Sequence, residues 1–150
     1  MNRMLVALAC VAAFSAPATA TEPGDALRPV HQFVESMNKG DLGSAVAACG
    51  DEMSIIDNVA PYQWHGKGAC EKWAGSQEAD STKKGLSDIV FKIGEATRFA
   101  ISNDSAYAVL PASYTFKEKG KPGRVEGTLT AALQKTPTGW HMTGFAFSER

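Results

Sequence analysis

The pattern of apolar and polar positions changes along the chain from a helical period to a strand period. Residues 25–38 carry apolar side chains at spacings of three and four, which is typical of an amphipathic helix. The segment 42–49 predicts a second, short helix with Asp41 as its capping residue. A third helix is expected from residue 69 to about 79, and the polar stretch 76–85 is expected to be a loop.

Strand-like segments lie between the second and third helices and again after residue 85. Residues 53–58 predict a short strand, and residues 63–65 predict a short return strand. The last third of the chain alternates with a period of two and predicts strands at 86–101, 106–117, 125–134 and 140–148. Short turns join these strands, so consecutive strands are expected to pair antiparallel. Helices followed by such a sheet predict an α+β domain.

The first twenty residues have the pattern of a secretory signal peptide. Arg3 precedes an apolar run at 4–14, and Ala18-Thr19-Ala20 is a small-residue cleavage signature. We therefore expect residues 1–20 to be removed and residues 21–150 to form one mature domain. The expected location is periplasmic or secreted.

Composition and charge exclude several classes of protein. The 150 residues are 44% hydrophobic and 21% charged, with a formal net charge of −1, which is a globular composition. Near-neutral charge without a basic run argues against a nucleic-acid partner. No apolar run after the leader approaches the roughly 20 residues that span a bilayer, so no membrane partner is expected after cleavage.

Two cysteines, Cys49 and Cys70, remain in the expected mature chain. A pair of cysteines in an exported protein predicts a disulfide. The alternative is that both are small buried hydrophobic residues.

Three short sequences resemble members of the nuclear transport factor 2 superfamily. Residues 33–42, FVESMNKGDL, look like the first helix of that superfamily and the corner after it, and residues 140–148, WHMTGFAFS, look like its final strand. Ile56-Asp57, with Gly66 nine residues after the aspartate, is similar to ketosteroid-isomerase-like and SnoaL-like proteins. The resemblance implies a cone-shaped fold, with three N-terminal helices packed on a curved, mainly antiparallel sheet. This fold carries many unrelated activities, so the resemblance does not name a function.

Asp57 is the leading catalytic candidate. It ends an apolar strand, where desolvation would raise the pKa of an isolated carboxyl group, and the resemblance implies a general base at this position. The tyrosine of the ketosteroid isomerases falls on Phe33, and their second acid falls near Thr130 or Ala131. Steroid isomerisation is therefore not expected, because the donors of the oxyanion hole are absent. The alternative is that Asp57 only accepts backbone N–H bonds in the next turn.

Histidines offer a second catalytic candidate but no metal site. His65 lies beside Trp64 in the short return strand and is a candidate base or partner of Asp57, with a partly exposed structural histidine as the alternative. His31, His65 and His141 have no metal-ligand spacing. We expect neither a metal nor a cofactor.

An apolar, aromatic-lined cavity is expected between the helices and the sheet. Its predicted lining is Phe33, Met37, Tyr62, Trp64, Trp73, Leu110, Tyr114, Leu129 and Met142. Small residues on the same faces, including Gly144 and Ala146 on the last strand, are expected to enlarge it. The leading hypothesis is an exported domain that binds a small apolar ligand without evident catalysis. The alternatives are an isomerase, cyclase, dehydratase or hydrolase that uses Asp57 as general base, and a protein-interaction or assembly module.

The last strand also predicts a homodimer. Simple alternation places Met142, Gly144 and Ala146 on one face and Phe145 and Phe147 on the other. Two phenylalanines on a face without a covering helix would leave an apolar patch, which a two-fold contact would bury. The resemblance also implies dimers across this face. A bulge in the strand would instead turn the phenylalanines inward.

Overall fold

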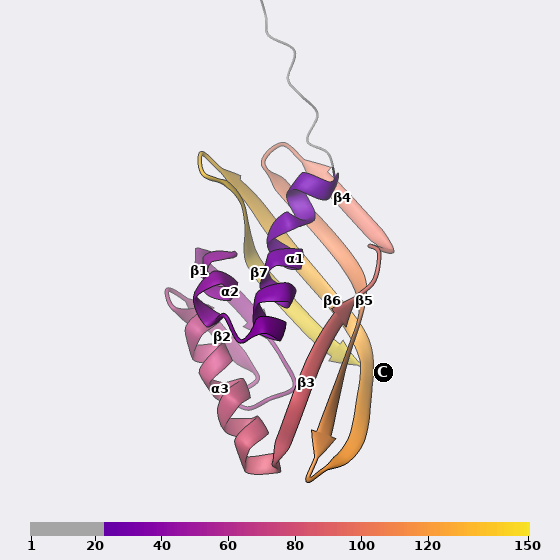
Figure 1. Cartoon of the computed structure of the whole chain (residues 1–150). Coiled ribbons are helices and arrows are strands. Elements are labelled where there is room, and N and C mark those ends of the chain that lie inside the picture. The colour runs from indigo at the N-terminus through magenta and orange to yellow at the C-terminus, as the bar shows by residue number, and fades with distance from the viewer. Residues whose placement is uncertain (1–22) are drawn as a thin grey trace, which may run out of the picture.

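A computed structural model describes residues 23–150, in which three helices pack on one face of a curved sheet (Figure 1). We call the helix-covered face concave and the opposite face convex. The elements are α1 (Pro23–Lys39), α2 (Leu42–Ala47), β1 (Cys49–Ile56), β2 (Gln63–Gly66), α3 (Ala69–Lys84), β3 (Leu86–Ile93), β4 (Arg98–Ser102), β5 (Ser105–Glu118), β6 (Lys121–Thr136) and β7 (Gly139–Glu149). This arrangement confirms the predicted α+β class. The predicted signal peptide lies outside the described residues.

The first two helices form the corner that the sequence predicts. Helix α1 begins two residues earlier than expected and buries Val30 and Phe33 against the sheet. Asp41 caps α2, because its Oδ1 accepts the Ser44 N–H at 3.0 Å. The helix ends at Ala47, so the expectation that it continues to residue 49 is wrong: Cys49 already begins β1, which pairs parallel with β7.

Helix α3 is longer than the hydrophobic pattern indicates. The polar stretch expected to be a loop continues the helix to Lys84, with an Asp80–Lys84 pair one turn apart at 2.7 Å. Only the first two turns are buried, and the rest of the helix lies at the surface, where polar residues are compatible with helix. The helix ends at Gly85, whose φ of +68° suits glycine.

The sheet has the strand order β2-β1-β7-β6-β5-β3, and β4 pairs with the other end of β5. The expected single strand at 86–101 is therefore wrong, because residues 94–97 separate two strands that both pair with β5. Pro111 of β5 faces this break and has no N–H to donate to an edge strand, a position where bulges are common.

A bulge in β7 reverses the expected orientation of its C-terminal half. Ala132 pairs with Gly144 and the next residue, Leu133, pairs with Met142, so Thr143 is an extra residue. Met142 and Phe145 consequently face the concave side, where Phe145 is 6% exposed. The expectations that Phe145 and Phe147 lie on the outer face, and that Gly144 and Ala146 enlarge the cavity, are wrong. The apolar patch on which the dimer prediction was based is not present.

The hydrophobic core lies between the helices and the concave face, and a disulfide closes one edge of it. Cys49 at the start of β1 is bonded to Cys70 in the first turn of α3, with their Cα atoms 6.6 Å apart. The bond thus joins α3 directly to the strand that it covers. In the described part of the chain, no helix is long and apolar enough to cross a membrane.

Candidate functional site

Asp57 lies on the concave face, directly after β1. Met53 and Ile55 alternate with exposed residues along β1, and Asp57 continues the buried series at 8% exposure. The backbone N–H of Asp57 donates to the Tyr62 carbonyl at 3.1 Å, which closes the loop to β2. The sequence therefore folds locally so that a carboxylate ends an otherwise apolar row.

Both oxygens of Asp57 accept hydrogen bonds. Oδ1 accepts from the Asn58 backbone N–H at 2.6 Å, and Oδ2 accepts from the Trp73 indole N–H of α3 at 3.0 Å. Burial raises the pKa of Asp57 above its ordinary value, and these bonds partly oppose that rise because they stabilise the charged form. Asp57 therefore fits both readings of the sequence: a turn acceptor and a carboxylate with an increased tendency to hold a proton.

A second carboxylate extends this polar group across the concave face. Glu149 Oε1 accepts from the Asn58 side-chain amide and from the Tyr114 hydroxyl, the latter at 3.3 Å. Burial and the negative charge of Glu149 raise the pKa of Tyr114 to about 12, so its phenol stays neutral at physiological pH. Hydrogen bonds therefore connect Trp73, Asp57, Asn58, Glu149 and Tyr114 in one series.

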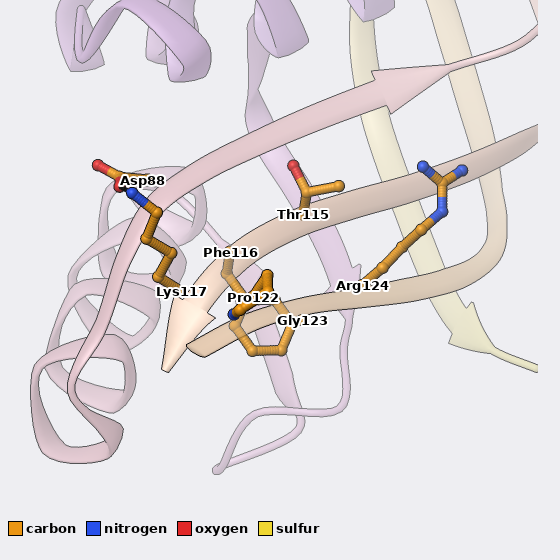
Figure 2. A pocket seen from close by; sticks show the side chains of 7 residues that line it. All are labelled: Asp88, Thr115, Phe116, Lys117, Pro122, Gly123 and Arg124. Carbon is orange, nitrogen blue, oxygen red and sulfur yellow. Dashed lines mark ion pairs between the residues drawn. The ribbon is translucent and has the colours of Figure 1, made fainter. Parts of the chain in front are cut away.

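Four aromatic rings lie next to this polar series, and we call them the aromatic surface: Phe91, Tyr114, Phe116 and Phe147. Tyr114 is central, with its ring centroid 5.8 Å from Phe91, 5.8 Å from Phe116 and 6.0 Å from Phe147. All four residues are partly buried. Two glycines of β6 make room for the outer rings. The Phe116 ring lies across Gly123 (Figure 2), and a Cβ on Gly127 would meet the Phe147 ring at 2.7 Å.

A separate trio of rings fills the space between the helices and the sheet. Phe145 lies 5.6 Å from Phe33 of α1 and 5.2 Å from Trp73 of α3, and the two helical rings are 5.5 Å apart. All three side chains are buried. This trio is part of the core, whereas the aromatic surface remains in contact with solvent.

The predicted lining residues divide in the same way. Phe33, Trp64, Trp73, Leu110 and Met142 are buried core residues, and Met37, Tyr114 and Leu129 are partly buried. Tyr62 lies apart from them and is 61% exposed. His65 is also exposed and pairs with Ser54, whose strand position faces away from Asp57. The structure thus brings Asp57, Trp73 and Tyr114 together and leaves His65 and Tyr62 outside.

Sequence reasoning missed several members of the site. Phe91, Phe116, Asn58 and Glu149 carried no motif, and Phe147 was placed on the wrong face. With the bulge at Thr143 taken into account, Phe145 faces the concave side, and simple alternation then places Phe147 and Glu149 on the same side. Contact between β7 and a loop 91 residues earlier leaves no local signal.

Two hollows are present on the surface of the described residues, and the first borders the aromatic surface at Phe116. One, of about 500 Å³, lies at the β5–β6 turn beside Phe116 and Pro122, and the Lys117–Asp88 pair at 2.7 Å borders it (Figure 2). The other, of about 430 Å³, lies between α1 and α2 and is lined by polar side chains. Asp57 lines neither hollow. In residues 23–150 no group of three His, Cys, Asp or Glu side chains is arranged to hold a metal ion.

Solved structures with this fold are numerous and distant in sequence. A ketosteroid isomerase-like protein from Erwinia carotovora atroseptica matches with a TM-score of 0.63 and 18% identity, over 84% of this chain and 94% of that chain. A nuclear transport factor 2-like superfamily protein from Salmonella enterica matches at 0.66 and 16%, over 81% and 86%. The hexachlorocyclohexane dehydrochlorinase LinA-type3 from Novosphingobium barchaimii matches at 0.69 and 9%, over 83% and 84%. Identities this low establish the fold alone.

Family membership rests on the sequence itself. The model of the SnoaL-like domain matches residues 28–148, which is most of the chain and the whole sheet except Glu149, the last residue of β7. No curated protein sequence matches significantly. The match begins inside α1 and ends in β7, so it spans both the helical layer and the aromatic surface. The chain belongs to the SnoaL-like domain family.

Proposed function

We propose that the protein is an exported SnoaL-like domain that binds a small, largely apolar molecule at the aromatic surface. The observation that supports this most is the contrast between two groups of rings on one face. Phe33, Trp73 and Phe145 are buried in the core, whereas the four rings of the aromatic surface stay partly exposed. Partly exposed aromatic rings with a few polar groups at their edge are typical of small-molecule sites.

Binding can be tested with a neutral planar probe, 1-naphthalenemethanol, by isothermal titration calorimetry. We expect wild-type protein to bind it and Phe147→Ala to weaken binding about tenfold, since one ring contact and its apolar area are lost. Phe99→Ala is the matched control, because Phe99 is also partly buried but lies in β4, at the other end of β5. Absence of binding by wild type, or equal losses in both variants, would contradict the proposal. Native mass spectrometry of protein purified from its own envelope would identify a retained natural ligand.

Export is supported by the signal-like sequence at 1–20 and by the Cys49–Cys70 disulfide, a bond that persists in oxidising compartments. N-terminal sequencing of envelope or secreted material should begin at Thr21. An intact leader on protein recovered from the cytosol would refute this part of the proposal.

Catalysis by Asp57 is the second candidate function, and the burial of its carboxylate favours it. Its raised pKa makes it a stronger base than an exposed aspartate. Proteins of the same fold include a dehydrochlorinase and a putative dehydratase. The test is proton exchange of 2-tetralone in D₂O, followed by NMR. Exchange above the buffer rate that is lost in Asp57→Asn would support catalysis, and exchange at the buffer rate would exclude it for this ketone.

A further inference from the structure

We infer that the aromatic surface selects ligands that carry a positively charged amine, with the Glu149 carboxylate as the partner of the ammonium group. This inference rests on the proposed binding function and adds the chemical class of the ligand. It concerns Glu149, Asn58 and Tyr114 rather than the candidate base Asp57.

The position of Glu149 is fixed by the strand that carries it. Phe145, Phe147 and Glu149 alternate along the end of β7, so the glutamate faces the concave side together with the two rings. Glu149 pairs with Gly127 of β6, which has no side chain to displace it. Its Oε1 accepts from Asn58 and from the Tyr114 hydroxyl, which hold the carboxylate at the edge of the aromatic surface.

No cationic side chain of residues 23–150 forms an ion pair with Glu149 or Asp57. Three ion pairs in this part of the chain join Lys84 with Asp80, Lys117 with Asp88, and Arg124 with Glu126, and none of the three includes Glu149 or Asp57. The neighbouring Arg150 donates to the Thr128 hydroxyl at 3.3 Å, and Thr128 lies between Gly127 and Leu129, on the convex face. The negative charge beside the rings is therefore not neutralised by these residues.

The polar atoms of Glu149 and Tyr114 that remain for a ligand are acceptors. The Tyr114 hydroxyl gives its only proton to Glu149, so its oxygen can only accept from a ligand. Both hydrogen bonds to Glu149 end on Oε1, which leaves Oε2 as the acceptor for a ligand. Aromatic faces also attract cations, because their π-electrons are negative. An ammonium group meets both features. A carboxylate would be repelled, and a neutral alcohol would gain stacking and one hydrogen bond without the charge attraction of an ammonium group.

Three matched probes separate these cases in isothermal titration calorimetry at pH 7: 1-naphthylmethylamine, 1-naphthalenemethanol and 1-naphthoate. We expect the amine to bind about tenfold more tightly than the alcohol, because it adds a charge-assisted hydrogen bond, and the carboxylate to bind most weakly. The preference for the amine should shrink as salt is raised, since Glu149 is exposed and salt screens its charge.

Two conservative variants decide the role of Glu149. Glu149→Gln should remove the preference for the amine and weaken amine binding far more than alcohol binding, because the amide oxygen still accepts a hydroxyl proton but carries no charge; the thermal melt should be unaltered. Glu126→Gln removes the same charge from β6 on the convex face, where Glu126 pairs with Arg124, and should keep the preference. Equal affinity of amine and alcohol for wild type, or a preference that survives in Glu149→Gln, overturns the inference while the proposed function stands. Failure of all three probes to bind refutes both.

Discussion

Truncation of Phe145 is the most direct test of how β7 is built. The ring is 6% exposed and contacts Phe33 at 5.6 Å and Trp73, edge-on, at 5.2 Å. Phe145→Ala removes a buried aromatic side chain, which costs about 3–5 kcal/mol including the cavity that remains. Domains of this size are stable by about 5–15 kcal/mol, so the variant should lose a large part of its free energy of unfolding.

Urea unfolding of oxidised protein, followed by far-UV circular dichroism, measures this loss. With an m-value of about 2 kcal/mol per molar urea, a loss of about 4 kcal/mol lowers the unfolding midpoint by about 2 M. Phe147→Ala is the internal control on the same strand and face. Its ring is only partly buried and contacts the Tyr114 ring at 6.0 Å, so we expect a smaller cost of about 1–2 kcal/mol.

The result that would refute this reasoning is a cost below about 1 kcal/mol for Phe145→Ala, with an unchanged m-value. A regular strand without the bulge at Thr143 would turn Phe145 to the opposite face, away from the helices. Truncation there would leave no internal cavity. The loss in free energy of unfolding for Phe145→Ala therefore distinguishes the bulged register from the regular one. A larger loss for Phe145→Ala than for Phe147→Ala would assign Phe145 to the core and Phe147 to the aromatic surface.

Three further predictions concern the disulfide, Asp57 and assembly. Thiol titration of denatured, oxidised protein should find neither Cys49 nor Cys70 free, and reduction should lower stability by about 3 kcal/mol, given their separation of 21 residues; a free thiol would contradict the pairing. Folding raises the pKa of Asp57 above its ordinary value of 3.8, so the folded protein holds this proton more tightly than the unfolded chain. The free energy of unfolding should therefore fall as pH rises from the pKa of the unfolded chain through the raised pKa of the folded protein, and Asp57→Asn should lose this pH dependence. Urea unfolding at a series of pH values measures it, and parallel profiles for wild type and Asp57→Asn would contradict it. A homodimer stays a prediction although the phenylalanines do not supply its contact; we propose the convex face around Ile56, which is 60% exposed, as the contact, so sedimentation equilibrium should show a dimer for wild type and a monomer for Ile56→Glu; a monomeric wild type would refute it.

Most of the fold could be predicted because its signals are local. The amphipathic stripe of α1, the Asp41 cap and the glycine-rich turns each specify a neighbouring element, and the order of those elements indicates the α+β class. The end of α3 could not be predicted from apolar spacing, because its last turns bury almost nothing and are held by backbone bonds and polar pairs. The split between β3 and β4 depends on Pro111 of the partner strand, 14 residues beyond the break at 97.

The candidate site was predicted less well than the fold, for a physical reason. Alternation assigns a side chain to a face, but one extra residue reverses the assignment for everything that follows it. Thr143 is that residue in β7, and it moves Phe145, Phe147 and Glu149 to the concave face together. Asp57 was identified because its position after an apolar strand depends on β1 alone.

The same bulge determines where a ligand can bind. Because it turns Phe145 inward, the Phe33–Trp73–Phe145 trio occupies the space beneath α1 and α3, which an unbulged strand with Gly144 and Ala146 inward would have left open. It also places Phe147 against Tyr114, and Glu149 within reach of the Tyr114 hydroxyl. The bulge at Thr143 therefore has two consequences. It places the Phe145 ring where a cavity was predicted near the helices, and it places Phe147 and Glu149 on the part of the concave face where the rings remain partly exposed. Deleting Thr143 should leave both arrangements in place, because Met142 and Gly144 would then be consecutive opposite Leu133 and Ala132 and Phe145 would still face the helices.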